Sequence, residues 1–211
     1  MISVATFPTG PLGCNCSVIV DSASQRAIVV DPGGDFEKIK AQLGDAKVDA
    51  IVHTHTHIDH VGATAPLQRM SGARACIHEQ DRFLYDLLPV QAAMLGIDLP
   101  ETVDMEGSLV DGGALDAGAI SMGILHTPGH TPGSVTFVVK AGDGTQHVFT
   151  GDTLFRRGIG RTDLWGGDSG AIMKSLREKI LALPDDAIVI AGHGPSTTIG
   201  AERSGNPFLN R

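Results

Sequence analysis

The sequence contains little cysteine and few basic residues. Its three cysteines, Cys14, Cys16 and Cys76, form an odd set without a C-x-x-C spacing, which favours a reducing compartment over a disulfide framework. Lys and Arg number 16 against 24 Asp and Glu, which gives a formal net charge of −8. Because RNA and DNA are normally bound by a basic surface, we expect no nucleic-acid partner.

Long hydrophobic runs are also absent. No apolar stretch reaches the roughly 18 residues that a membrane span requires, and residues 1–8 lack the basic and apolar segments of a secretion signal. No charge block, low-complexity stretch or internal repeat marks a linker. With 42% hydrophobic residues, the sequence predicts one domain over residues 1–211, a cytoplasmic location and no membrane association.

Histidine, by contrast, is concentrated in one place. Residues 53–60 hold four of the nine histidines, where random placement would give roughly 0.3 of one. The cluster directly follows Val48–Val52, an apolar run of strand length, so it is not a terminal tag. Side chains two apart on extended backbone point the same way, so His55 and His57 can close on one metal ion. Asp59 and His60 fall where the chain should turn into a helix, and they point elsewhere, which indicates two ions.

Three later segments share one local form, an extended run that ends in a glycine-bearing turn with one ligand-grade residue. They are residues 129–133 with His130, residues 149–153 with Asp152, and residues 191–195 with His193. Glycine permits the tight turns and close backbone approach that a site built from several loops needs. Any one of these segments alone is more typical of an ordinary turn, but their order after the histidine cluster is diagnostic.

These segments together resemble the metallo-β-lactamase-fold hydrolases, and among them the short, single-domain type of glyoxalase II, or hydroxyacylglutathione hydrolase. The resemblance extends over nearly the whole chain. The motifs that carry it are residues 12–16 (LGCNC), 31–34 (DPGG), 54–60 (THTHIDH), 126–133 (HTPGHTPG), 151–155 (GDTLF), 160–163 (GRTD) and 206–209 (NPFL). The periodicity alone predicts only α/β layers. The resemblance implies an α/β (α+β) fold, a four-layer αββα sandwich with a dinuclear metal site at the edge of its sheets.

The resemblance also implies a ligand set and a reaction. His55, His57 and His130 would bind the first metal, Asp59, His60 and His193 the second, and Asp152 would bridge them. Two divalent ions are implied, zinc by default, although iron and manganese suit the same ligands. A hydroxide between them would attack S-2-hydroxyacylglutathione thioesters such as S-lactoylglutathione, a step of methylglyoxal detoxification, with Asp59 and Asp152 as the catalytic carboxylates. No G-x-S-x-G motif offers a serine nucleophile.

The substrate side of the resemblance is less complete. Arg161 matches a basic residue that holds a glutathione carboxylate in glyoxalase II, although a solvated loop arginine explains it equally well. The tyrosine that follows in longer members is missing, since Tyr85 is the only tyrosine, and we expect no helical C-terminal glutathione-binding domain. We expect a small thioester as the partner. The oligomeric state cannot be read from the sequence.

Other functions are compatible with the same motifs. A mononuclear iron persulfide dioxygenase shares the fold and several ligand positions, and related hydrolases act on another small ester, a lactone or a lactam. A metal-binding scaffold without activity is a third class, which the complete ligand set disfavours. His53 and His126, close to ligands in sequence, are candidate hydrogen-bond partners of the ligating histidines.

Local patterns predict the following elements. Strands are expected over residues 2–7, 17–21, 27–31, 48–52, 73–77, 120–125, 134–139, 147–150 and 187–190. Helices are expected over residues 36–43 behind an Asp35 cap, over 61–70 and over 169–181. Residues 79–96 predict one or two helical turns broken at Pro89, and residues 97–118 only turns and short extended pieces.

Overall fold

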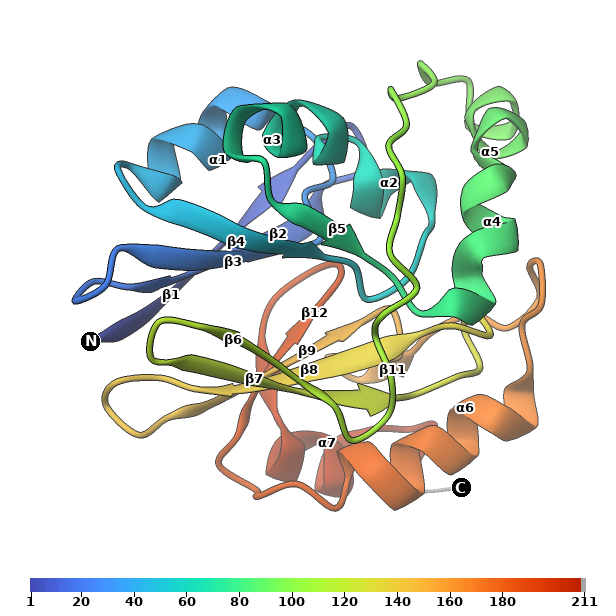
Figure 1. The fold of residues 1–211 in the computed structure, drawn as a ribbon. Helices are drawn as coiled ribbons and strands as arrows, with labels where there is room; N and C mark the ends of the chain where they lie inside the picture. Colours follow the sequence, from blue (N-terminus) through green and yellow to red (C-terminus); the bar gives the residue numbers. More distant parts are fainter. Residues whose placement is uncertain (210–211) are drawn as a thin grey trace.

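The computed structural model describes residues 1–209, which form two facing β-sheets with helices on both outer sides (Figure 1). The first sheet has the order β1-β2-β3-β4-β5 and the second the order β13-β12-β9-β8-β7-β6. The strands of the first sheet are β1 (Ile2–Thr9), β2 (Cys14–Asp21), β3 (Arg26–Val30), β4 (Lys47–Val52) and β5 (Arg74–Cys76). Those of the second are β6 (Ala114–Ala117), β7 (Ile120–His126), β8 (Val135–Lys140), β9 (Gln146–Gly151), β12 (Ile188–Ala191) and β13 (Thr197–Thr198). A small ribbon, β10 (Leu154–Phe155) with β11 (Gly158–Ile159), follows β9.

Three apolar layers hold these sheets and helices together. Along β3, Ala27 and Val29 belong to the layer beneath the outer helices, while Ile28 and Val30 belong to the layer between the sheets. Successive side chains of a strand point to opposite faces, so a strand buried on both sides is apolar at every position. A third layer packs the second sheet against the C-terminal helices. The expected four-layer αββα sandwich is confirmed.

The helices outside the first sheet begin with α1 (Phe36–Leu43), as predicted. Asp35 stands at its cap position with φ 51°, but its side chain makes no capping bond and instead accepts a hydrogen bond from the Gly10 nitrogen at 3.2 Å. The helix expected over residues 61–70 is present only from residue 64 onward. The chain forms two helices, α2 (Ile58–Val61) and α3 (Thr64–Ser71). Gly62 lies between them, where a Cβ would come within 2.3 Å of the Gly33 carbonyl oxygen.

The segment after β5 is more regular than its sequence suggests. A short 3-10 turn (Glu79–Asp81) leads into α4 (Arg82–Asp86) and α5 (Leu88–Leu95). Pro89 lies in the first turn of α5 and the break falls at Leu87, because a proline at a helix start loses no hydrogen bond. Within the unassigned residues 97–118, β6 pairs antiparallel with β7.

The C-terminal part covers the second sheet. The helix expected over residues 169–181 is present as α6 (Ser169–Ser175), and it continues as a π-helical turn (Leu176–Ile180). The last helix, α7 (Ile199–Gly205), and strand β13 were not predicted. None of the helices in residues 1–209 is both long enough and apolar enough to cross a bilayer.

Candidate metal centre

The site lies where several strands of the two sheets end. Strands β4, β9 and β12 each run into a segment with ligand-grade side chains, and the loop between β7 and β8 adds His130. Strands β9 and β12 are parallel, so their carboxyl ends meet at one edge. All seven predicted ligands come together there. Their ligand atoms form groups in which every pair lies within 4.8 Å: His55, His57 and His130; Asp59, His60 and His193; and His55, His60 and Asp152.

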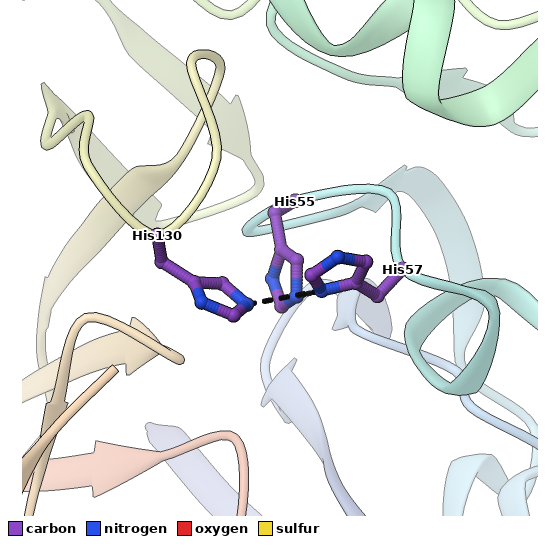
Figure 2. A group of neighbouring side chains, drawn as sticks. All are labelled: His55, His57 and His130. Atoms are coloured by element: carbon purple, nitrogen blue, oxygen red, sulfur yellow. Dashed lines mark hydrogen bonds between the residues drawn. The ribbon is translucent and has the colours of Figure 1, made fainter. Parts of the chain in front are cut away.

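The first group consists of three imidazoles from two loops. Nδ1 of His57 lies 2.9 Å from Nε2 of His55 and 3.0 Å from Nε2 of His130. Figure 2 shows the three rings converging, with His130 approaching from the loop opposite His55 and His57. Nitrogens this close can share one ion, whose bonds to imidazole are about 2.0–2.1 Å long. The prediction that His55 and His57 point to a common position is confirmed.

The second group joins helix α2 to the loop after β12. Oδ2 of Asp59 lies 3.0 Å from Nε2 of His193 and 3.8 Å from Nε2 of His60. Asp59 and His60 lie inside the one-turn helix α2, not ahead of a longer helix as expected. Their side chains still reach a different point from those of His55 and His57, as expected.

Asp152 lies between the two groups. Its Oδ1 is 3.6 Å from Nε2 of His60, and its Oδ2 is 3.7 Å from Nε2 of His130 and 3.9 Å from Nε2 of His193. One carboxylate therefore faces histidines of both groups. This is the position that a bridging ligand requires.

The donor atoms fit a pair of cations. In the described chain, Nε2 of His60 and Oδ1 of Asp152 are buried without a hydrogen-bond partner. Buried polar atoms nearly always have a hydrogen-bond partner, so two such atoms without one at the same place indicate that a bound group is missing. Nitrogen and carboxylate oxygen are the ligands that zinc, iron and manganese accept. Divalent ions at the two groups would satisfy these atoms.

The electrostatics of the first group favours neutral imidazole. Burial, together with the neighbouring His130 and His60, lowers the pKa of His57 to about 3. Burial, followed by neighbouring histidines, also holds the pKa of His55 well below its usual value, and burial lowers that of His130. A ligating histidine must be neutral, so this group is prepared to bind metal at neutral pH.

In the second group the pKa shifts of His193 and Asp59 favour the charged forms instead. The hydrogen bond to Asp59 raises the pKa of His193. Burial opposes ionisation of Asp59, but the nearby His60 and His193 outweigh it and lower the pKa of this carboxyl. Asp59 is therefore ionised at neutral pH and can act as a ligand or as a hydrogen-bond acceptor.

Three polar groups lie behind the candidate histidine ligands. Nδ1 of His130 lies 2.8 Å from the Arg161 carbonyl oxygen, Nδ1 of His55 lies 3.1 Å from the Thr54 hydroxyl, and Nδ1 of His60 lies 3.1 Å from Oδ2 of Asp31. Such partners fix which ring nitrogen faces the metal. Sequence reasoning assigned none of them a role. The one local signal was Asp31 at a strand end, ahead of a proline and two glycines.

The two histidines expected to supply such contacts face other groups. Nδ1 and Nε2 of His53 lie 3.2 Å from the Cys76 carbonyl oxygen and 2.8 Å from the Thr64 hydroxyl. Nε2 of His126 lies 2.8 Å from the Pro132 carbonyl oxygen, and its ring stacks on that of His78. The hypothesis that they orient the ligands is wrong.

A cavity of 370 Å³ opens above the two groups, with His57, Asp59, His130 and Asp152 in its lining. Arg161 also lines it, as the proposed substrate contact requires. Its guanidinium, however, donates from Nε and Nη2 to the two carboxylate oxygens of Asp163, at 2.7 and 2.8 Å. The charge expected to hold glutathione is thus already paired with an exposed carboxylate.

Two facing sheets with outer helices and His/Asp clusters at one edge define a class of metal-dependent enzymes, and the family comparison agrees. The model of the Metallo-beta-lactamase superfamily matches residues 9–193, and this chain belongs to that family. An uncharacterised protein of Mycobacterium tuberculosis is 42% identical over 98% of this chain and 97% of its own length. Hydroxyacylglutathione hydrolase GloC of Haemophilus influenzae is 38% identical over 99% of each chain.

Solved structures agree with this assignment. The BLEG-1 B3 metallo-beta-lactamase is 34% identical with a TM-score of 0.89 over 99% of this chain and all of the other. TTHA1623, solved in a di-iron-bound form, is 37% identical with a TM-score of 0.85 over 97% of this chain and 100% of that one. Fold, clusters and relatives together support a metal-dependent hydrolase.

Proposed function

We propose that this chain hydrolyses S-2-hydroxyacylglutathione thioesters, such as S-lactoylglutathione, at a dinuclear metal centre. The observation that carries the proposal is the position of Asp152, whose two oxygens lie 3.6–3.9 Å from histidines of both ligand groups. The 38% identity to a protein named hydroxyacylglutathione hydrolase supports the substrate class.

Bound ions would supply a water deprotonated near neutral pH and a Lewis acid for the thioester carbonyl. The protein's own part begins with Asp59, which lines the cavity and whose lowered pKa keeps it ionised. In our proposal Asp59 accepts a hydrogen bond from the attacking water and aligns it with the carbonyl carbon. His55, His57 and His130, held neutral by burial, would keep the first ion in place.

The leaving group places few further demands on the protein. A thiol has a pKa of about 8.5, so its thiolate departs readily without a strong general acid. The described cavity lining contains no Lys, Tyr or Cys side chain that would act as one. The site therefore fits a thioester better than an amide or an alkyl ester with a poor leaving group.

The metals belong to the same proposal. We propose two divalent ions, with His55, His57 and His130 on the first, Asp59, His60 and His193 on the second, and Asp152 between them. The di-iron form of the 37% identical TTHA1623 supports iron, while zinc is the commoner ion at such ligands. Manganese suits the same donor set.

Metal analysis of the freshly purified protein, run beside an S-lactoylglutathione hydrolysis assay, tests the proposal. We expect close to two ions per chain, and Asp152→Ala should lower metal content and activity together by orders of magnitude. Asp59→Asn should mainly lower kcat, because it acts on the nucleophile. The matched control is Asp116→Asn, which removes an exposed carboxylate on β6 and should change neither quantity.

Two other results would replace the proposal. One tightly bound iron, oxygen uptake with glutathione persulfide and no thioester hydrolysis would identify a persulfide dioxygenase. Cleavage of a chromogenic cephalosporin in preference to thioesters would identify a lactamase, a candidate that the 34% identity to BLEG-1 favours.

A further inference from the structure

The wall of the cavity above the metal ligands is largely apolar. Leu12 enters it from the turn between β1 and β2, Met94 and Leu95 from α5, and Leu164 and Trp165 from the loop after β11. The ring of Trp165 lies 6.4 Å from that of His57, centroid to centroid. Leu12, Met94 and Leu95 remain 45%, 64% and 50% exposed. Exposed apolar side chains that gather around one cavity indicate a binding surface, whereas single exposed apolar side chains scattered over a protein do not.

The polar side chains of this wall that are not ligand candidates are already engaged. Gln91 accepts a hydrogen bond from the Ile58 nitrogen at 2.9 Å and donates one to the Leu84 carbonyl oxygen at 2.8 Å. Arg161 donates to both oxygens of Asp163. Arg161 is the only Lys or Arg side chain of the described lining and is paired with Asp163, so the lining offers a substrate no unpaired side-chain cation.

These features disfavour a charged group beside the scissile bond. A glutathionyl group carries two carboxylates and one ammonium, and moving them against an apolar wall removes their hydration without replacing it. An uncharged apolar group gains from the same transfer. A lactoyl group fills only a fraction of the 370 Å³ cavity, which leaves room for the group on sulfur.

We propose that this cavity is a binding site for an uncharged, apolar group on the thioester sulfur. Neutral thioesters of apolar thiols are then better substrates than glutathione thioesters of the same acyl group. The inference rests on the proposed thioester hydrolysis. In that reaction the water oxygen bonds to the carbonyl carbon, the carbon–sulfur bond breaks, and the sulfur leaves with the electron pair and takes up a proton.

Trp165 is the only tryptophan of the chain, so its fluorescence reports directly on the cavity. Two non-hydrolysable thioethers serve as probes of the metal-containing protein: 1-(benzylsulfanyl)propan-2-ol, which is neutral, and S-(2-hydroxypropyl)glutathione, which is charged. We expect the neutral probe to change the Trp165 emission with a Kd at least about tenfold lower than that of the glutathione probe. The corresponding lactoyl thioesters should differ in KM in the same direction.

Two variants and one control distinguish the effect of the apolar wall from the effect of the Arg161–Asp163 ion pair. Met94→Ala should weaken the neutral probe several-fold, whereas Val110→Ala, which truncates a side chain that is 57% exposed and outside this cavity lining, should leave its Kd unchanged. Asp163→Asn frees the Arg161 guanidinium, so it should strengthen the glutathione probe and leave the neutral one as it was. The side chains of Met94, Val110 and Asp163 are all exposed, so the three variants should fold.

The possible results distinguish failure of this inference from failure of the proposed function. If the glutathione probe binds as tightly as the neutral one, or if Met94→Ala weakens neither, the inference is overturned. If S-lactoylglutathione has the lower KM, thioester hydrolysis stands and the inference fails. If the neutral probe binds but no thioester is cleaved, the apolar site is supported and the proposed function fails.

Discussion

Nδ1 of His60 lies 3.1 Å from Oδ2 of Asp31, and both side chains are buried. The same carboxylate accepts hydrogen bonds from the backbone nitrogen and the hydroxyl of Thr54, each at 2.7 Å. Asp31 follows β3 with φ 48°, a left-handed conformation that Asp and Asn tolerate better than most residues. This carboxylate therefore joins the second ligand group to the loop that carries the first.

Asp31→Asn tests this role, because asparagine keeps the size and tolerates the backbone conformation but removes the charge. We expect affinity for the second ion to fall about 10- to 100-fold, the usual effect of losing a partner behind a ligating histidine. Competition with a chelator, followed by metal analysis, measures it. The control is Asp49→Asn, whose carboxylate pairs with Arg26 outside the described clusters. Equal metal retention by all three proteins would contradict this role.

Asn15 fixes the loop that presents His193. Its side-chain nitrogen donates to the carbonyl oxygens of Ala191 and Gly194, both at 2.9 Å, and its backbone nitrogen donates to that of Gly192 at 2.7 Å. We expect Asn15→Ala to lower the free energy of unfolding by about 1–3 kcal/mol, since it leaves two carbonyls without their donor.

The metal content distinguishes a positioning role of Asn15 from simple loss of stability. The His193 side chain is 31% accessible, against 0% for His60 and 3% for His130, so its position depends more on its own loop. Asn15→Ala should therefore lose the second ion to a chelator before the first. Thr6→Ala, which removes a hydroxyl contact with Ser17 between β1 and β2, should keep both ions. Equal loss from both variants would rule out a specific effect of Asn15.

The features that were predictable from sequence are local ones. Strands such as β3 and β4 are apolar because both faces are covered, and that composition is visible in five or six residues. The candidate ligands could be located because the segments that carry them follow strands and contain tight turns. Two residues of separation sufficed to pair His55 with His57.

The features that were missed depend on contacts distant in sequence. Between α2 and α3, Gly62 lies against the Gly33 carbonyl oxygen and the Ala63 nitrogen donates to the Pro32 carbonyl oxygen at 2.8 Å, so this junction depends on the loop after β3. Asp31 acquires its role only when β3 and β4 pair in register, which brings it beside Thr54 and His60. The Arg161–Asp163 pair is different, because residues two apart were visible in the sequence and could have been paired there.

Removing the metals should lower the melting temperature. The candidate ligands span residues 55–193 and are brought together only in the folded chain, so we expect ions to bind the folded chain and not the unfolded one. At a free metal concentration about 1,000-fold above Kd, binding stabilises by about 4 kcal/mol. For a chain of this length that corresponds to roughly 10 °C.

Calorimetry before and after treatment with a chelator measures the shift, and reloading with zinc or iron should restore it. Asp152→Ala should shift much less, because its metal site is already impaired. An unchanged melting temperature in the wild type, despite complete removal of metal, would contradict the expected coupling between binding and folding.

Asp81 connects the two loops of the first ligand group. Its Oδ2 accepts hydrogen bonds from the Thr56 nitrogen at 3.2 Å and the Thr131 hydroxyl at 2.8 Å, and its Oδ1 accepts one from the Gly133 nitrogen at 2.6 Å. Thr56 lies between His55 and His57, and Thr131 follows His130. Burial raises the pKa of the Asp81 carboxyl to about 6, although these hydrogen bonds oppose the rise.

A raised pKa sets the sign of a pH effect on stability. The folded chain holds the Asp81 proton more tightly than the unfolded chain, in which the pKa is about 3.9, so this contribution is complete below about pH 4 and is lost as the pH rises through about 6. Between about pH 4.5 and about pH 7.5 the loss amounts to about 2 kcal/mol. Urea unfolding in the presence of a chelator should therefore show the advantage of wild type over Asp81→Asn shrinking by that amount. Asp116→Asn, which removes an exposed carboxylate, should keep the pH dependence of the wild type. A wild-type advantage that stays constant over this range would mean that Asp81 does not titrate there.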